Sequence, residues 1–356
     1  MRQGRQPERR GKRVTPRCKQ TGCTRDPSFP HSPPLEGCPK GGVVRESMHN
    51  RRPEFSVCIP AYNDLDAFTR CIASVLRQKD IVLECVVNDD STNSEIAEYV
   101  GTVPDARVVY RRNEQRLGPV CNWNAALQRA TGECLTLLHQ DDWYRSEETL
   151  KKIYDIFQKQ EADVLFCGRA LYQDGKCLGE YPMSLEKVRG FRKRFPGRTL
   201  VVNTLGHPGV AFFHQRRQDL LYDTALVYFS DTEYYARLIH SSKKIAVCEE
   251  ALVAVNRSGK QLSAACLAHP DTLVPQLAHA LRKHNATNLE SSLALARFFA
   301  GNMRHWRGSG IVNALYGAHA EFSLLILIIT IVSFPAFFVH MFYRALYRRV
   351  TGKVWG

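Results

Sequence analysis

The sequence predicts an α/β fold built on a mostly parallel, doubly wound sheet. Three observations support this class. Apolar runs of strand length alternate with segments of helical periodicity from Phe55 onward, several of these runs end in acidic residues, and 356 residues are enough to bury a large core. Repeated strand and helix units of this length imply parallel strands joined by crossover helices. We therefore expect ligands to bind at the carboxyl edge of the sheet.

The predicted elements follow one another with short connections. The predicted strands are residues 55–59, 81–87, 107–110, 135–138 and 164–171. The helix after the first strand has its apolar residues on one face, and Pro119 stands at a first-turn position of a later helix. A turn at residues 173–176 ends the last of these units.

Acidic residues follow two of the predicted strands. Asp89 and Asp90 come after the second strand, and Asp141 and Asp142 come after the fourth. Adjacent carboxylates repel each other, so a divalent cation between them and a ligand would stabilise the pair. The alternative is that Asp141 or Asp142 only caps the helix that follows. With residues 60–64 after the first strand, three strand ends would line one crevice suited to a polar nucleotide.

Common nucleotide-binding motifs are absent from the sequence. It has no GxGxxG after the first strand and no GxxxxGK[ST] anywhere. Neither a dinucleotide-binding fold nor a P-loop is therefore supported.

The net charge of +14 is unevenly distributed. Residues 1–47 hold 11 Lys and Arg against 4 Asp and Glu, which gives +7, half of the total. Residues 1–52 have almost no apolar periodicity, so we expect a disordered basic arm, and we consider nucleic acid an unlikely partner. Several of the 12 cysteines lie inside apolar patterns, which favours free thiols in a reducing compartment.

Three stretches of the chain resemble a known family. They are FSVCIPAYND, VVNDDST and RRNEQRLGPVCNWNAALQRATGECLTLLHQDDW, within residues 55–171. They are similar to the nucleotide-binding half of family 2 glycosyltransferases, which have the GT-A fold. The resemblance implies that a sugar passes from a nucleoside-diphosphate sugar to an acceptor hydroxyl with inversion, and that a divalent metal, Mg²⁺ or Mn²⁺, takes part.

The resemblance also implies positions for the donor site. Asp90 would hydrogen-bond the base, and Gly118 and Asn124 match the loop and helix start that approach the ribose and the diphosphate. The residues expected to flank the nucleotide are Pro60, Ala61, Tyr62 and Asp64.

The metal position departs from the family pattern. His139, Gln140 and Asp141 stand where the family has Asp-x-Asp, so Gln140 would lie beside the donor, Asp141 would contact the metal, and Asp142 would be its neighbour or substitute. His139 is a further candidate ligand, but a neutral imidazole does not offset the charge of Mg²⁺, which favours a structural role.

The second half of the chain has a weaker resemblance. Residues 201–213 are similar to the segment that closes over the donor, and residues 229–237 to an acidic motif in which Asp231 would be the general base. Glu233 is the competitor, and either acid would alternatively pair with Arg237. The residues expected on the acceptor side are Trp143, His207, Arg237 and Arg257.

Two segments predict contact with a membrane. The cations within residues 187–198 belong either to a solvated loop or to a surface for anionic lipid or a lipid-linked acceptor. Residues 322–343 are almost wholly apolar, which predicts a membrane anchor, with a buried core helix as the alternative. We accordingly expect the protein on the cytoplasmic face of the inner or plasma membrane.

We therefore expect an inverting glycosyltransferase of cell-surface polysaccharide or glycolipid synthesis. The expected division is a basic arm (1–52), a nucleotide-sugar-binding half (53–175), an acceptor-side portion (176–265), a helical region (266–320), and an anchor with a basic tail (321–356). One alternative is a sugar-phosphate nucleotidyltransferase, although residues 60–64 lack its Gly-rich phosphate loop. Another is a non-catalytic protein that binds lipid or nucleic acid through its basic arm.

Overall fold

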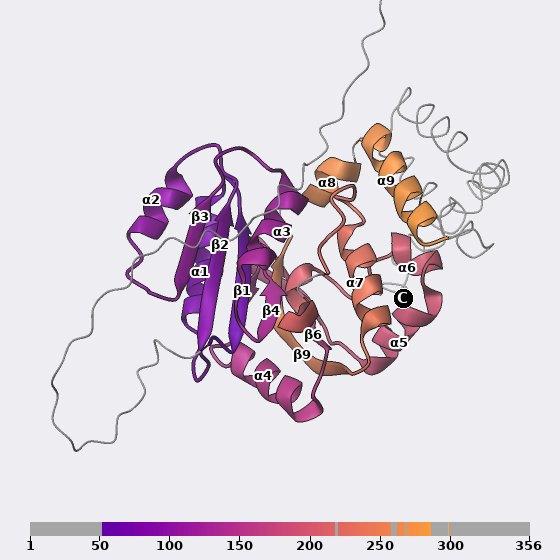
Figure 1. Ribbon diagram of the computed structural model, residues 1–356, viewed down its shortest axis with the longest axis horizontal. Coiled ribbons are helices and arrows are strands. Elements are labelled where there is room, and N and C mark those ends of the chain that lie inside the picture. The colour runs from indigo at the N-terminus through magenta and orange to yellow at the C-terminus, as the bar shows by residue number, and fades with distance from the viewer. Residues whose placement is uncertain (1–51, 218–219, 258–261, 268, 286–297, 299–356) are drawn as a thin grey trace, which may run out of the picture. The chain divides into compact units, whose positions relative to one another are not determined.

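The computed structural model describes residues 52–217, 220–257, 262–267, 269–285 and 298 (Figure 1). All of them belong to a compact unit that begins at Met48. The expected basic arm (apart from Arg52), the expected anchor at 321–356 and most of the region 266–320 lie outside the described residues. Within the described part of the chain, no helix is both long enough and apolar enough to cross a membrane.

The described strands form one sheet in the order β3-β2-β1-β4-β8-β6-β9-β5, with β7 paired to β6 (Figure 1). The strands are β1 (Phe55–Ala61), β2 (Leu83–Asp89), β3 (Val108–Arg112), β4 (Cys134–Leu137), β5 (Trp143–Tyr144), β6 (Val164–Gln173), β7 (Lys176–Tyr181), β8 (Ala211–His214) and β9 (Ile245–Asn256). β1 pairs in parallel with both β2 and β4, and β2 with β3. This half of the sheet is as predicted.

The other half of the sheet is mixed, which corrects the expectation of a mostly parallel sheet. β8 runs antiparallel to both β4 and β6, and β5 runs antiparallel to β9. β6 and β7 form a hairpin whose turn contains Asp174 and Gly175, both at positive φ. The expected boundary between residues 175 and 176 therefore falls in a hairpin turn, and the strands on its two sides belong to the same sheet.

Helices cover both faces of the sheet, as a doubly wound arrangement requires (Figure 1). They are α1 (Leu65–Leu76), α2 (Glu95–Gly101), α3 (Pro119–Arg129), α4 (Thr149–Gln160), α5 (Leu185–Arg194), α6 (Gly197–Val201), α7 (Ser230–Ser241), α8 (Leu262–Leu267) and α9 (Pro270–Lys283), with 3₁₀ turns η2 (Pro208–Val210) and η3 (Gln215–Arg217). Val57 of β1 packs with α1 and α4, whereas the next residue, Cys58, packs with α3 and α7. This alternation follows from the two-residue period of a strand.

A third apolar cluster attaches α9 to the rest of the fold. Leu273 and Leu277 of α9 pack against Leu200 of α6 and Phe229, which precedes α7. Burying side chains of this size typically contributes about 1.5–3 kcal/mol each. The start of α7 is thus held from both sides, by the sheet and by α9.

Candidate active site

A cleft of about 640 Å³ opens where the carboxyl ends of β1, β2 and β4 meet. Ala61 ends β1, Asp90 follows β2 and Asp141 follows β4, and all three line the cleft. Residues at the starts of α1, α3, α7 and α8 form the rest of its wall. Ligands of open α/β sheets bind at this edge, where the strand ends and the helix N-termini converge.

Asp90 is 5% exposed and lies in the wall of the cleft. Its carboxylate accepts hydrogen bonds from the backbone N–H groups of Leu117 (2.7 Å) and Gly118 (2.9 Å) and from the side-chain amide of Asn113 (2.8 Å). A carboxylate has about four acceptor positions. One position therefore remains for an N–H group of a ligand, and this placement fits the expected contact with a base.

Gln140 connects the segment after β4 to the segment after β1 through hydrogen bonds. Its side-chain amide accepts from the Tyr62 N–H (2.7 Å) and donates to the Tyr62 carbonyl (2.8 Å). The Tyr62 ring is 38% exposed, with the Arg116 guanidinium 4.9 Å from its centre, and Pro60 lies in the same wall of the cleft. A fixed aromatic ring at the rim of a cleft can stack against a flat base.

Two further expected residues shape the cleft through the backbone. Gly118 precedes α3 at a φ of +80°, a conformation that L side chains rarely adopt, and this conformation aims its N–H at Asp90. Asp64 lines the cleft and caps α1 by accepting from the Ala67 N–H (3.1 Å).

Asn124 does not lie where the sequence predicts, beside the ribose and the diphosphate. It is buried, and its side-chain amide exchanges two hydrogen bonds of 2.8 Å with the backbone of Tyr222. Because both ends of the amide are engaged, Asn124 is not available to the ribose or the diphosphate. Its place in the fold is to hold the segment before α7 against α3.

His139, Asp141 and Asp142 form a compact group of possible metal ligands. One ligating atom from each residue lies within 4.8 Å of the others. Asp142 is only 1% exposed, and one of its oxygens, Oδ1, accepts from the Asn256 N–H at 3.3 Å. Its Oδ2 and the Nε2 of His139 are buried without a hydrogen-bond partner in the described structure. Buried polar atoms are rarely left unpaired, so these two atoms fit a bound cation.

The environment of this group favours neutral forms when no cation is bound. Burial raises the pKa of Asp141, and burial together with the Asp141 carboxylate raises the pKa of Asp142. Burial, with a smaller effect of His207, lowers the pKa of His139 to about 3, so its imidazole is neutral at pH 7. A bound divalent ion would favour the ionised forms of the two carboxylates and would therefore lower their pKa values.

Asp231 reaches the same cleft from the first turn of α7. Burial raises its pKa to about 7, although Ser230, which donates a hydrogen bond to it at 3.4 Å, favours the charged form. A carboxylate that titrates near the working pH is suited to accept a proton from a substrate. Asp90, Asp141 and Asp231, which come from distant parts of the sequence, thus meet in one cleft.

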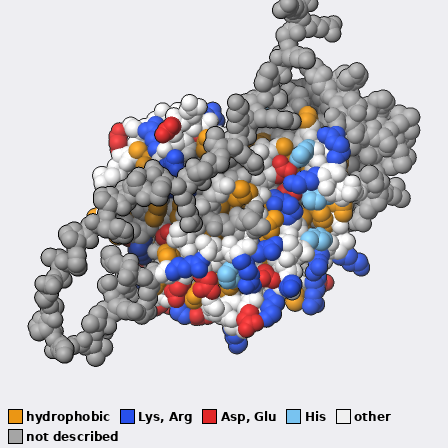
Figure 2. All heavy atoms as spheres, viewed as in Figure 1, with side chains coloured by type: hydrophobic (Ala, Val, Ile, Leu, Met, Phe, Trp, Pro, Cys, Tyr) orange, Lys and Arg blue, Asp and Glu red, His pale blue; other side chains and the backbone are white. Residues whose placement is uncertain are grey.

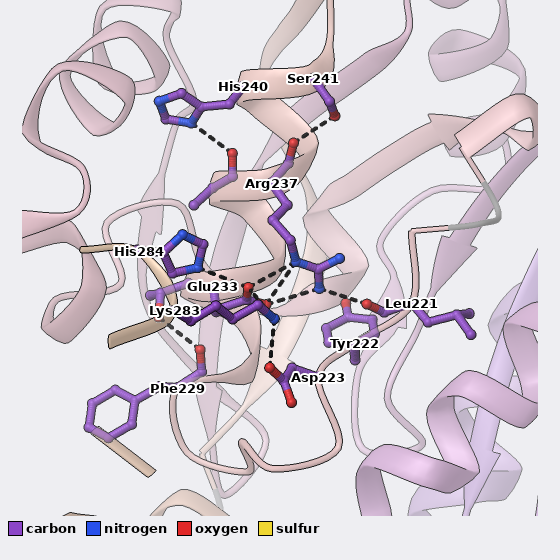
Figure 3. Close-up of polar contacts among 12 residues, drawn as sticks. Leu221, Tyr222, Asp223, Phe229, Glu233, Arg237, His240, Ser241, Lys283 and His284 are labelled. Atoms are coloured by element: carbon purple, nitrogen blue, oxygen red, sulfur yellow. Dashed lines mark hydrogen bonds and ion pairs between the residues drawn. The ribbon is translucent and has the colours of Figure 1, made fainter. Parts of the chain in front are cut away.

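Glu233 and Arg237, by contrast, are engaged with each other away from the cleft (Figure 3). Glu233 is 0% exposed and accepts from Arg237 (2.9 Å), Lys283 (3.0 Å) and His284 (3.0 Å). Although burial alone would raise its pKa, these hydrogen bonds and charges lower the pKa to about 2. Such an acid is a poor base, and neither residue lines the cleft. The structure thus places Glu233 and Arg237, expected as a catalytic and an acceptor-side residue, outside the wall of the cleft.

Of the other residues expected on the acceptor side, His207 lines the cleft and Arg257 does not. His207 lines the cleft, and burial, with smaller effects of Arg169 and Arg257, lowers its pKa to about 4. The Arg257 side chain is exposed and does not line the cleft, and its backbone N–H donates to the Tyr172 carbonyl (2.7 Å). Arg257 is thus near His207 but not in the wall of the cleft.

Arg70 is a cleft residue that the sequence analysis did not identify. Its guanidinium lies 4.6 Å from the centre of the Trp143 ring, and it partly offsets the rise in the pKa values of Asp141 and Asp142. Trp143, expected on the acceptor side, does not line the cleft and supports Arg70 instead. One signal was available, because Arg70 lies one helical turn after Asp66, which also lines the cleft.

Solved structures of other proteins share this fold. Residues 1–349 of TarS from S. aureus in complex with UDP-GlcNAc align with a TM-score of 0.55 and 17% identity, over 75% of this chain and 80% of that one. The mannosyltransferase PcManGT from Pyrobaculum calidifontis, in complex with GDP-Man and Mn²⁺, aligns with a TM-score of 0.51 and 19% identity, over 85% of this chain and 84% of that one. Identities this low show the common GT-A fold alone.

Sequence relatives match slightly more than half of this chain. An uncharacterized protein of Mycobacterium tuberculosis is 30% identical over 218 residues, which are 57% of this chain and 66% of that protein, just under two thirds. The putative colanic acid biosynthesis glycosyl transferase WcaA of Escherichia coli is 26% identical over 196 residues, which are 52% of this chain and 66% of WcaA. Residues 56–224 match the model of the family described as glycosyl transferase family 2. This segment of the chain is therefore similar to glycosyltransferase family 2, as the resemblance of its motifs implied.

Proposed function

We propose that this protein transfers a sugar from a nucleoside-diphosphate sugar to an acceptor hydroxyl, with inversion, in the synthesis of a cell-surface polysaccharide or glycolipid. The observation that carries the proposal is the single cleft lined by Asp90, Asp141 and Asp231. The complexes of the two structural relatives with UDP-GlcNAc and GDP-Man, and the printed role of WcaA in colanic acid biosynthesis, support the donor class and the pathway class.

Different residues of the cleft would bind the nucleotide and activate the acceptor. Tyr62 would stack on the base while Asp90 accepts one of its N–H groups. Asp231 would take the proton of the acceptor hydroxyl as that oxygen attacks the sugar from the side opposite the diphosphate. General base catalysis of this kind typically contributes about 10²–10⁴ in rate.

Metal dependence is part of this proposal. Asp141 and Asp142 would hold the ion, which fits the unpaired Oδ2 of Asp142 and the closeness of the ligating atoms. When bound, a divalent ion supplies electrostatic stabilisation of the departing diphosphate. The complex of PcManGT contains Mn²⁺, which supports this choice of cofactor class.

We also propose that the acceptor is lipid-linked and that the enzyme works at the cytoplasmic face of the inner or plasma membrane. The exposed cations of α5 support a contact with anionic lipid. The expected C-terminal anchor lies outside the described residues.

Hydrolysis of nucleotide sugars tests the proposed activity. The full-length protein is incubated with a panel of UDP-, GDP- and other nucleotide sugars, with and without a chelator, and release of the nucleoside diphosphate is measured. We expect slow, metal-dependent release from one donor, abolished by Asp141→Asn. The matched control is Asp155→Asn, because Asp155 is an exposed acid of α4 that pairs with Lys151 and does not line the cleft.

Two outcomes would contradict the proposal. Release of sugar phosphates and nucleoside triphosphates on addition of pyrophosphate would favour the nucleotidyltransferase alternative. A complete lack of metal-dependent turnover, together with lipid or nucleic-acid binding lost on deletion of residues 1–47, would favour the non-catalytic alternative.

A further inference from the structure

We propose that His139 is a metal ligand together with Asp141 and Asp142, and that its imidazole makes the site prefer Mn²⁺ and later first-row ions to Mg²⁺. This inference rests on the proposed function, because the ion concerned is the one that would bind the donor diphosphate. It replaces the structural role that the sequence favours for His139.

The surroundings of the imidazole argue against a purely structural histidine. Neither ring nitrogen of His139 donates or accepts a hydrogen bond with any residue in the described part of the chain, and its Nε2 is buried without a partner. The ring packs against Trp123 with 4.8 Å between the ring centres, which fixes its plane. His139 as a whole is half-buried, but a buried ring nitrogen is rarely left unpaired, so a ring packed against Trp123 with an unpaired Nε2 is suited to bind a ligand.

The three residues bring possible ligating atoms close together. The ligating atoms of His139, Asp141 and Asp142 lie within 4.8 Å of one another, and the Oδ2 of Asp142, a residue only 1% exposed, is also unpaired. Two ligands on opposite sides of an ion with bonds of about 2.1 Å are about 4.2 Å apart. Small rotations of side chains are enough to close this group around an ion.

The Arg70 guanidinium is a positive charge that could in principle pair with Asp141 and Asp142 in place of a metal ion. It lines the cleft near both carboxylates, but its guanidinium lies over Trp143, and it forms no ion pair with a described carboxylate. The second oxygen of Asp142 therefore stays unpaired in the presence of Arg70. A cation from solution would supply the partner that this oxygen lacks.

The kind of donor atom determines which ion is preferred. Mg²⁺ favours oxygen ligands and retains its water, whereas imidazole nitrogen binds later first-row metals more strongly. One nitrogen and two carboxylates also match a divalent charge without excess. We therefore expect Mn²⁺, Co²⁺ or Zn²⁺ to bind better than Mg²⁺, by more than in a site made of three carboxylates.

Direct metal binding tests this without a donor. Mn²⁺ is titrated into the metal-free, full-length protein, free Mn²⁺ is measured by electron paramagnetic resonance, and Mg²⁺ is then added as competitor. His139→Ala should weaken Mn²⁺ binding about tenfold or more, since even residues that only support metal ligands typically contribute that much. His139→Asp should shift the Mn²⁺ to Mg²⁺ affinity ratio toward Mg²⁺. The control is His240→Ala, because His240 bonds the Ala236 carbonyl near the other end of α7 and does not line the cleft.

The outcomes separate this inference from the proposed function. Unchanged Mn²⁺ affinity in His139→Ala, or an unchanged affinity ratio in His139→Asp, with circular dichroism showing native folding, would overturn the role of His139 alone, provided that donor hydrolysis still requires a metal. If Asp141→Asn also leaves Mn²⁺ binding unchanged, the metal is not in this cleft, and the metal dependence proposed for the function fails as well.

Discussion

Asp231 and Glu233 are two residues apart on α7, yet they have opposite chemistry. Burial in the cleft raises the pKa of Asp231 to about 7, whereas hydrogen bonds and charges from three neighbours lower the pKa of Glu233 to about 2. Positions i and i+2 of a helix point in different directions, so one acid faces the cleft and the other faces α9. The difference favours Asp231 over Glu233 for the proposed role of general base.

The rate should depend on pH through Asp231. A base must be deprotonated, so kcat/KM should rise with pH and level off above about 7, where the folded protein has lost this proton. Asp231→Asn should lower kcat by about 10²–10⁴ with little change in donor binding. The measurements are a pH–rate profile and titration of the donor by calorimetry.

The control for this prediction is Asp155→Asn, because Asp155 is an exposed acid of α4 that pairs with Lys151 and lies outside the contacts around α7. An acidic limb that persists in Asp231→Asn would mean that another group sets the pH dependence.

At the scale of elements, α7 is held between α9 and α3 by a continuous set of polar contacts (Figure 3). Lys283 of α9 bridges Asp223 (2.6 Å) and Glu233 (3.0 Å). Arg237 binds Glu233 and also donates to the Leu221 carbonyl (2.6 Å), and the next residue, Tyr222, is bonded to Asn124 of α3. These contacts fix the position of α7, and with it Asp231, relative to the cleft.

Glu233→Gln should destabilise the fold by about 3 kcal/mol at pH 7, because it leaves the surrounding cations without their buried partner. The folded pKa of Glu233 is lowered, so its contribution is complete above the unfolded pKa of 4.5 and is lost as pH falls toward about 2. The difference between wild type and variant should therefore shrink by about 2 kcal/mol between pH 7 and pH 3. Urea unfolding at both pH values measures it.

The control variant here is Glu161→Gln, because Glu161 forms an exposed ion pair with Lys244 that solvent screens. A Glu233→Gln protein as stable as wild type at pH 7 would show that the contacts around α7 contribute little.

The predictable part of the fold is the part that depends on local sequence. Apolar runs that end in acids predicted β1, β2 and β4 and brought Asp90 and Asp141 to one edge. The reversed strand β8 has only four residues inside a segment interpreted as a closing loop, and such a short run carries no signal of direction. The role of Glu233 was not predictable either, because its partners Lys283 and His284 lie about 50 residues away on α9.

At the scale of the whole molecule, the exposed cations of α5 form a charged surface outside the cleft. Exposed Lys and Arg side chains lie over α5 (Figure 2), where Arg189, Arg192, Lys193 and Arg194 have no ion pair with any described residue. Val188 and Phe191 of the same helix are buried, so the cationic face is fixed outward. Leu185 at its start is 40% exposed, and Leu178 in the preceding strand β7 is 53% exposed. Exposed apolar side chains beside unpaired cations are typical of surfaces that bind anionic membranes.

Vesicle binding should therefore depend on α5. Each cation near an anionic surface contributes about 1 kcal/mol, so replacing Arg189, Arg192 and Lys193 with Gln should weaken partitioning onto phosphatidylglycerol vesicles by about two orders of magnitude. Salt should weaken wild-type binding in the same direction, because the attraction is screened within about 10 Å at 0.1 M. The matched control replaces Arg77, Arg111 and Lys159, which are exposed cations elsewhere on the protein.

Equal losses of vesicle binding in the two triple variants would mean that only net charge matters. Unchanged binding of the α5 variant, with release on removal of the residues after Glu321, would instead assign the membrane contact to the C-terminal segment.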